Sequence, residues 1–270
     1  MQITNLVAGQ PGSTMNTRIV GDSKGAFDVI EYTRDASVGP WNAVAEYYMG
    51  QMGVRRRQLC CQLTGKNKIT IQAGAMHWMV GNIQMISGIK GVANFIGKSV
   101  KGKLTGEAAA MPEYTGTGLI LTEPTYKYLL LEDLSRWPGG MVVEDGMFYA
   151  CDDQCHPSVV HRKSVSSAVA GGEGLFNMCL KGNGVAALES NVPREELIEV
   201  DIDNGEELKV DGHFAIAWSA DLQFTVERSA KSLIGSAMSG EGLVNVYRGR
   251  GKVLLAPVTP SSSFFAATNS

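Results

Sequence analysis

The chain has 270 residues, of which 44% are apolar and 19% are charged, and its formal net charge is −3. This composition is typical of a folded globular protein and excludes an intrinsically disordered chain. No run of residues approaches the ~18 consecutive apolar residues of a membrane-spanning helix. The first residues also lack the basic-then-apolar pattern of a signal peptide. We therefore expect a protein without a membrane span.

The chain contains five cysteines. An odd number in a chain of this size predicts reduced thiols rather than a disulfide framework. They are Cys60, Cys61, Cys151, Cys155 and Cys179. Because reduced thiols are typical of the cytosol, we expect a cytoplasmic location.

Residues 1–58 predict a small extension of mixed α and β structure. Thr17–Val20 and Ala26–Tyr32 alternate in hydrophobicity like two strands, joined through Gly21–Gly25. Pro40–Met49 predicts one short helix that stops near the glycines that follow it. The string Gly-Asp-Ser-Lys-Gly at 21–25 matches a nucleophile elbow, but that device requires a strand-to-helix turn. Here both flanks resemble strands, so we expect a hairpin loop rather than a catalytic serine.

A repeated motif organises the rest of the chain. Gly-Glu pairs begin at 106, 172 and 240, and Gly-X-Gly strings begin at 116, 182 and 249, so every spacing is between 66 and 68 residues. The motif residues are Gly106, Glu107, Gly172, Glu173, Gly174, Asn177, Gly240, Glu241, Gly242 and Asn245. Apolar, β-branched runs flank each Gly-X-Gly string, so each copy predicts a β-hairpin with the glycines at its turn. We expect the glutamates and asparagines to support these turns.

A second element recurs between these hairpins, as a short strand bracketed by glycines. Its copies are Gly65–Gly74, Gly140–Gly146 and Gly205–Gly212, and a further apolar run follows each. Together the two elements predict a mainly β protein of three tandem modules after the extension. The predicted boundaries are 59–128, 129–196 and 197–260, with a tail at 261–270. One such module buries little surface alone, so neighbouring modules must cover each other.

Arg55, Arg56 and Arg57 form a cluster of a kind that can bind phosphates. On the way into a strand, however, adjacent side chains point alternately to two faces. The chain is slightly acidic, and no Lys or Arg position recurs in all three modules. The sequence therefore argues against a nucleic-acid partner.

Cys151, Cys155 and His156 are the candidate metal ligands, because two thiolates and an imidazole can occupy three positions of a zinc site. Their spacing matches no recurrent zinc-finger pattern, and adjacent residues in a strand point to opposite faces. We therefore favour a loop of reduced thiols and expect no bound metal or cofactor. No spacing in the chain suggests a Ser/His/Asp or Cys/His catalytic set.

Several motifs resemble the altered-inheritance-of-mitochondria protein 24 family over about residues 60–260. These motifs are Gln72–Met76, Gly172–Asn177, Ala215–Trp218, Phe224–Glu227, Ser239–Asn245 and Gly249–Val253. The resemblance implies a fold like that of the tryptophan-RNA-binding attenuation protein (TRAP-like), of β-sandwich or short double-stranded β-helix type, with three such modules per chain. It also implies that three chains close into a ring, which would leave no module edge exposed. The family supplies no agreed catalytic residues, so none is assigned.

These observations lead to a functional hypothesis. We expect a non-enzymatic, ring-forming β-protein, a homotrimer that acts as a scaffold or interaction module. A small-ligand or RNA-binding protein that uses clefts between modules is the alternative. A metal-dependent enzyme built on the Cys151 cluster is a third hypothesis. The ligand and any protein partner are left open by the sequence.

Overall fold

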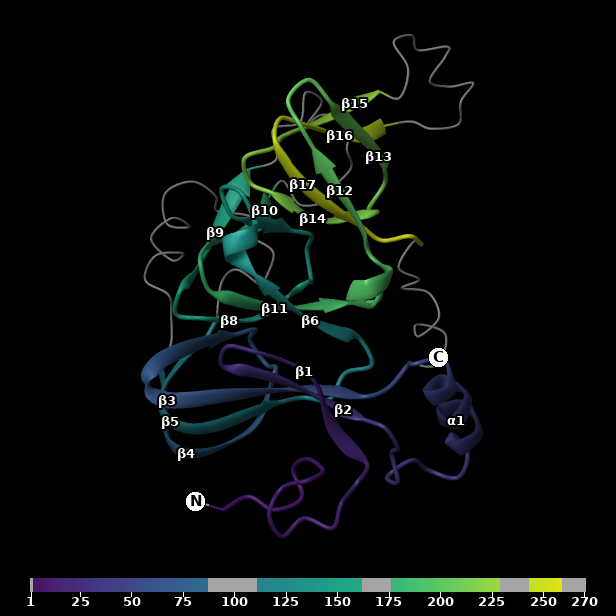
Figure 1. The fold of residues 1–270 in the computed structure, drawn as a ribbon, viewed down its shortest axis with the longest axis vertical. Coiled ribbons are helices and arrows are strands. Elements are labelled where there is room, and N and C mark those ends of the chain that lie inside the picture. Colours follow the sequence, from purple (N-terminus) through teal and green to yellow (C-terminus); the bar gives the residue numbers. More distant parts are fainter. Residues whose placement is uncertain (1, 87–110, 162–175, 229–242, 259–270) are drawn as a thin grey trace. The chain divides into compact units, whose positions relative to one another are not determined.

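The computed structural model describes residues 2–86, 111–161, 176–228 and 243–258, and it confirms a mainly β protein (Figure 1). The first strands are β1 (Arg18–Lys24), β2 (Phe27–Tyr32), β3 (Arg57–Ile71), β4 (Met76–Ile86), β5 (Glu113–Thr122), β6 (Tyr128–Asp133), β7 (Met141–Val143) and β8 (Phe148–Asp152). The next are β9 (Cys155–His161), β10 (Phe176–Gly182), β11 (Val185–Ser190), β12 (Ile198–Ile202), β13 (Glu207–Asp211), β14 (Ala215–Ser219), β15 (Gln223–Arg228), β16 (Leu243–Arg248) and β17 (Gly251–Leu255). The helical structure in these described ranges comprises α1 (Ala43–Gln51) and the single turns η1 (Leu134–Arg136) and η2 (Arg194–Glu196).

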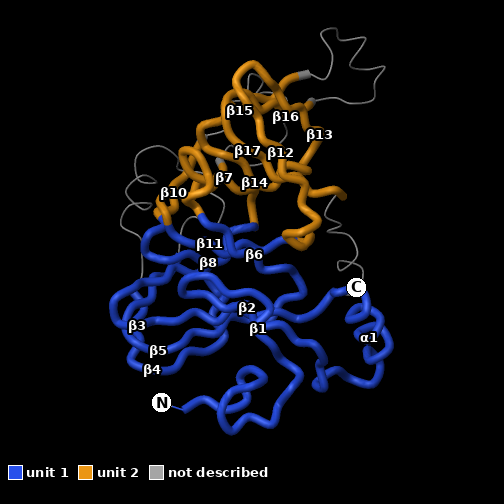
Figure 2. The backbone as a smooth tube through the Cα atoms, in the orientation of Figure 1, with its two compact units in different colours: residues 1–133, 147–155, 184–190 blue, residues 134–146, 156–183, 191–270 orange. Residues whose placement is uncertain are grey.

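The chain divides into two compact units, each assembled from three separate segments (Figure 2). Unit 1 contains residues 1–133, 147–155 and 184–190, and unit 2 contains residues 134–146, 156–183 and 191–270. The segment predicted as the second module, 129–196, contributes strands to both units. The division of the chain into three modules stays a prediction.

The N-terminal extension forms the predicted hairpin and helix. β1 and β2 pair antiparallel from Arg18 opposite Tyr32 to Lys24 opposite Phe27. The turn is tighter than we predicted, because residues 21–24 continue β1 and only Gly25 and Ala26 form the connection. Gly25 has φ +60°, a conformation that favours glycine. The serine of the elbow-like string therefore lies in a hairpin strand, not in a strand-to-helix turn.

Unit 1 holds one sheet, in the order β1-β2-β3-β8-β11-β6, with β5 paired to β3 and β4 paired to β5. In the first part of β3, both faces are covered. On one face, Leu59 and Cys61 belong to the hydrophobic core that includes Phe27. On the other face, Cys60 belongs to a second hydrophobic cluster that includes Ile30. Burial on both faces explains why Leu59, Cys60 and Cys61 form an unbroken apolar run instead of an alternating pattern.

The first Gly-X-Gly string does not form the hairpin turn that we predicted. Gly116 and Gly118 lie inside β5, which continues through them to Thr122, beside β4 (Figure 1). The two strands approach closely there. A Cβ atom on Gly118 would stand 2.1 Å from the carbonyl oxygen of Val80. These glycines therefore permit a close backbone contact in the middle of a strand.

Unit 2 holds two sheets, in the orders β12-β17-β14-β7-β10-β9 and β13-β16-β15. The other two Gly-X-Gly strings connect strands as predicted, but the flanking strands do not pair as hairpins. β16 belongs to the three-stranded sheet and β17 to the six-stranded sheet, while β10 and β11 also belong to different sheets. Each glycine string therefore passes the chain from one sheet to another. The core of unit 2 centres on the ring cluster of Trp218, Phe224 and Tyr247.

The three-stranded sheet of unit 2 is joined on its surface by Arg248 of β16. Its guanidinium pairs with Glu207 of β13 at 2.7 Å and with Glu227 of β15 at 2.6 Å. The hydrogen bond from Arg248, followed by one from Thr225, lowers the pKa of Glu227 from 4.5 to about 2.

We expect Glu227→Gln to reduce stability at pH 7 by no more than the about 1 kcal/mol that exposed ion pairs contribute. Because the folded-state pKa is lowered, this stabilisation exists above pH 4.5 and disappears as the pH falls toward 2. Thermal unfolding of the wild-type protein and Glu227→Gln between pH 7 and 2 measures the difference in their stability. Glu196→Gln, which removes a carboxylate outside these ion pairs, is the control. A difference between the two proteins that stays constant down to pH 2 would contradict this prediction.

Candidate functional site

Among the described residues, a strand pairing with the same geometry occurs once in each unit. In unit 1, the end of β3 pairs antiparallel with β8, and in unit 2, β7 pairs antiparallel with β14. The pairs in unit 1 are Ile69 with Asp152, Thr70 with Cys151, and Ile71 with Ala150. Those in unit 2 are Met141 with Ser219, Val142 with Trp218, and Val143 with Ala217. We call each of these pairings a junction.

The strands beside the two junctions also correspond. β8 pairs with β11 and β14 pairs with β17, and each of these pairings skips one residue, Tyr149 in β8 and Ile216 in β14. β4 pairs with β5 in the same way and skips His77. On the other side, β7 pairs with β10 as β13 pairs with β16. β4 is therefore equivalent to β8 and β14, the strands on one side of each junction. β13 is equivalent to β7, on the other side of the junction in unit 2.

β4 and β13 differ from these counterparts in one respect. Within the described ranges, β4 pairs with β5 alone and β13 with β16 alone, so neither has a junction partner. Both are edge strands, whose free N–H and C=O groups can template pairing with another strand. Met79 of β4 is 42% exposed, whereas its counterparts Cys151 and Trp218 are 0% and 4% exposed. The open edges of β4 and β13 are the candidate functional site.

The candidate metal ligands are not arranged as a ligand set. Cys151 and Cys155 are buried, whereas His156 is exposed. A hydrogen bond from the Cys151 thiol to Cys155, followed by burial, raises the pKa of Cys151 well above its usual value. A protonated thiol is a poor metal ligand. Across the described part of the chain, no three His, Cys, Asp or Glu side chains are grouped so that they could hold a metal ion.

All five cysteines are free, in agreement with the predicted reduced thiols, and the structure adds that all five are buried. Burial, followed by the charge of Asp28, raises the pKa of the Cys60 thiol to about 12. A thiol with such a pKa is protonated at neutral pH and is therefore a weak nucleophile.

Most of the repeated Gly-Glu motif lies outside the described residues. Gly106, Glu107, Gly172, Glu173, Gly174, Gly240, Glu241 and Gly242 all fall in the ranges 87–110, 162–175 and 229–242. Each of these ranges connects two strands that pair with each other, namely β4 with β5, β9 with β10, and β15 with β16.

The two asparagines of the motif are described, and they make comparable contacts. Asn177 of β10 donates a hydrogen bond to the carbonyl oxygen of Val143 at 3.0 Å. Asn245 of β16 donates one to the carbonyl oxygen of Gly212 at 2.8 Å. Each amide thus binds backbone at or just beyond the end of the neighbouring strand, β7 or β13.

The comparisons with known proteins agree with the fold. The family model described as mitochondrial biogenesis AIM24 matches residues 52–258. The chain belongs to the AIM24 family. This match leaves out β1, β2 and α1, so these three elements lie outside the AIM24 segment.

The AIM24 fold has a counterpart among solved structures. The crystal structure of protein SPYM3_0169 from Streptococcus pyogenes is similar, with a TM-score of 0.53 and 20% sequence identity. The likeness covers 76% of this chain and 89% of that one. At this identity it supports the fold alone. A search of curated proteins finds no match. In the parts of the chain that are described, no helix has the length and apolar character needed to cross a membrane.

Proposed function

We propose that this AIM24-family chain is a non-enzymatic scaffold that assembles with copies of itself. β13 of one copy pairs antiparallel with β4 of the next copy, in the geometry of the two internal junctions. One observation carries the proposal. The junction occurs once in each unit, and one strand of each junction type has no such partner in the described chain. A second copy supplies the missing strand at both edges.

The internal junctions predict the register between copies. Lys209 would lie opposite Trp78, Leu208 opposite Met79, and Glu207 opposite Val80. The middle pair corresponds to Thr70 with Cys151 and to Val142 with Trp218, which are all buried. The pair of Leu208 with Met79 is apolar as well, so assembly would remove the exposed side chain of Met79 from water.

Head-to-tail pairing is heterologous, so it yields either a closed ring or an open filament. Closure leaves no such edge exposed. The family resemblance implies three chains, and we propose that number. A scaffold of this kind would offer other proteins several equivalent surfaces.

Disulfide cross-linking tests the proposal. We expect the double variant Met79→Cys, Leu208→Cys to form disulfides between copies when it is oxidised, up to a covalent trimer on a non-reducing gel. Directly opposed strand residues have Cα atoms about 4.5–5.5 Å apart, within the range that a disulfide bridges. The native cysteines are buried and should contribute little background.

The matched control keeps Leu208→Cys and moves the other cysteine along β4. Met85 is also exposed on β4, but it lies six residues beyond Met79, or about 20 Å along the strand. Met85→Cys, Leu208→Cys should therefore remain uncross-linked. Equal cross-linking of both variants, or a single-chain band alone in both, would refute the proposed pairing.

A further inference from the structure

A pocket of about 510 Å³ lies beside α1 in unit 1. Most of its lining residues precede the AIM24 segment, whereas Val54, Arg55 and Arg56 lie at the start of that segment. Its walls come from α1, from residues 32–38 after β2, and from residues 54–56 before β3. Three arginines line it, namely Arg34, Arg55 and Arg56, against the two carboxylates of Asp35 and Glu46. Its volume lies within the range of small-molecule sites.

Arg56 is neutralised and held in place within this pocket. Its guanidinium pairs with Asp35 at 3.0 Å and with Glu46 at 3.8 Å, and its Nε donates a hydrogen bond to the hydroxyl of Tyr126. Burial would raise the pKa of Asp35, but hydrogen bonds from Ser37 and the charge of Arg56 outweigh it and lower the pKa. Both carboxylates of the pocket therefore form ion pairs with Arg56, and Glu46 also accepts a hydrogen bond from the hydroxyl of Tyr126.

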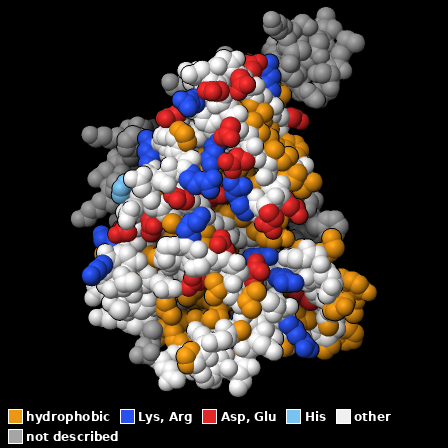
Figure 3. Space-filling view, in the orientation of Figure 1, with side chains coloured by type: hydrophobic (Ala, Val, Ile, Leu, Met, Phe, Trp, Pro, Cys, Tyr) orange, Lys and Arg blue, Asp and Glu red, His pale blue; other side chains and the backbone are white. Residues whose placement is uncertain are grey.

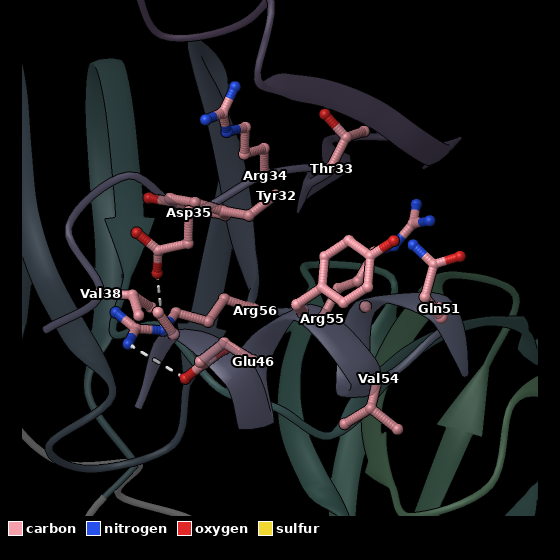
Figure 4. A pocket seen from close by; sticks show the side chains of 13 residues that line it. Tyr32, Thr33, Arg34, Asp35, Val38, Glu46, Gln51, Val54, Arg55 and Arg56 are labelled. Carbon is pink, nitrogen blue, oxygen red and sulfur yellow. Dashed lines mark ion pairs between the residues drawn. The ribbon is translucent and has the colours of Figure 1, made fainter. Parts of the chain in front are cut away.

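The remaining arginines have no carboxylate partner in the part of the chain that is described. The Nε atom of Arg55 is buried and makes no hydrogen bond there, although a buried guanidinium donor normally has an acceptor. Figure 4 shows Arg56 with Asp35 and Glu46 on one side of the pocket and Arg55 with Gln51 on the other. The free positive charge thus lies with Arg55 and with Arg34, which is exposed.

We propose that this pocket binds a small organic anion, whose phosphate or carboxylate group is held by Arg55. A guanidinium matches the geometry of both oxyanions and can bind either one through two hydrogen bonds. The acceptor oxygens of the ligand complete the hydrogen bonding of Arg55. The amide of Gln51 lies at the same side of the pocket and supplies a further donor.

The apolar part of the lining favours an organic anion over a bare ion. Val38, Ala43, Tyr47 and Val54 all line the pocket, and Tyr47 is 63% exposed. These side chains offer an apolar surface beside the arginines, on which a ring or short hydrocarbon of the ligand can pack. The ligand class is therefore an aryl or alkyl phosphate or carboxylate.

Calorimetric titration of the full-length protein at low salt tests the proposal, with phenyl phosphate, benzoate and inorganic phosphate as probes. We expect at least one of the two organic anions to bind more tightly than inorganic phosphate. The tighter of the two identifies a phosphate or a carboxylate ligand. In Arg55→Gln, the dissociation constant should rise about tenfold or more, and in Arg34→Gln it should rise less.

Arg250→Gln is the matched control, because Arg250 is 81% exposed in unit 2 and its loss changes the net charge equally. It should leave binding unchanged. If Arg55→Gln fails to fold, as judged by its thermal unfolding, Gln51→Leu replaces it and should weaken binding severalfold.

Three results would overturn the inference. The first is equal affinity of the wild-type protein and Arg55→Gln. The second is binding of inorganic phosphate alone, or of no probe at millimolar concentration. The third is binding to vesicles of phosphatidylglycerol without binding of either organic anion, which would indicate that the exposed side chains around α1 contact a membrane surface instead.

Discussion

Replacement of Gly116 by alanine is expected to lower the free energy of unfolding by about 3–5 kcal/mol. A Cβ atom at this position would stand 2.0 Å from the carbonyl oxygen of Asn82 and 3.1 Å from the Cα atom of Ile83. Both obstacles belong to the backbone of β4, so no side-chain rotation can relieve them. Gly116 also has φ +118°, which adds strain for any L-residue with a side chain. Urea unfolding of the two proteins measures the loss.

Gly74→Ala separates the two causes of this expected loss. Gly74 also has positive φ, at +82°, but an added Cβ atom would meet nothing within 4 Å. Alanine there should cost only the backbone term, about 1–2 kcal/mol. Equal losses in the two variants would show that β4 and β5 do not approach as closely as described.

The substitution Met79→Asp is expected to dissociate the assembly into single chains. In the proposed register, the new carboxylate would lie opposite Leu208, at a position whose counterparts in the internal junctions are buried. Burial of an unpaired carboxylate costs several kcal/mol, so the association constant should fall about a hundredfold or more. Met79 is 42% exposed in one chain, and its own fold should tolerate the change. Sedimentation velocity over a range of concentrations reports the mass of the particle.

Met85→Asp is the control for this experiment. Met85 is also an exposed methionine of β4, at 56%, but it lies outside the proposed pairing with β13. This variant should keep the mass of the wild-type particle. The proposal fails if Met79→Asp sediments like the wild-type protein, or if the wild-type protein is itself a single chain.

Local elements of the fold were predictable from the sequence, whereas the membership of strands in sheets was not. The β1–β2 hairpin and α1 depend on neighbouring residues, and their positions in the structure agree with the prediction to within a few residues. The strings at Gly116, Gly182 and Gly249 were all interpreted as hairpin turns. A glycine pair shows that the backbone needs an unusual conformation or close contact, but not whether the next strand folds back, continues or enters another sheet. That outcome depends on partners far away in the sequence.

The candidate sites follow the same division. The cluster Arg55, Arg56 and Arg57 was noted for its possible affinity for phosphate, but the sequence could not show which of the three is neutralised. In the structure, Arg57 is buried, pairs with Glu31 at 2.7 Å and stacks on Tyr128. Arg56 pairs with Asp35 and Glu46, so among the described residues Arg55 is the one arginine of the three without a carboxylate partner. The repeats implied that the terminal modules need partners, but the sequence could not show that the open edges are those of β4 and β13, because an edge is defined by the pairing of strands far apart in the chain.

The interleaving of the two units has a consequence for any attempt to divide this protein. The polypeptide passes from one unit to the other five times, and all five crossings fall between residues 133 and 191. No single cut can therefore release either unit whole. A fragment that ended at Asp133 would lose β8 from the end of β3 and β11 from β6, exposing new strand edges on both. Expression of the halves as separate genes should give aggregates, and co-expression would be needed to restore the missing strands.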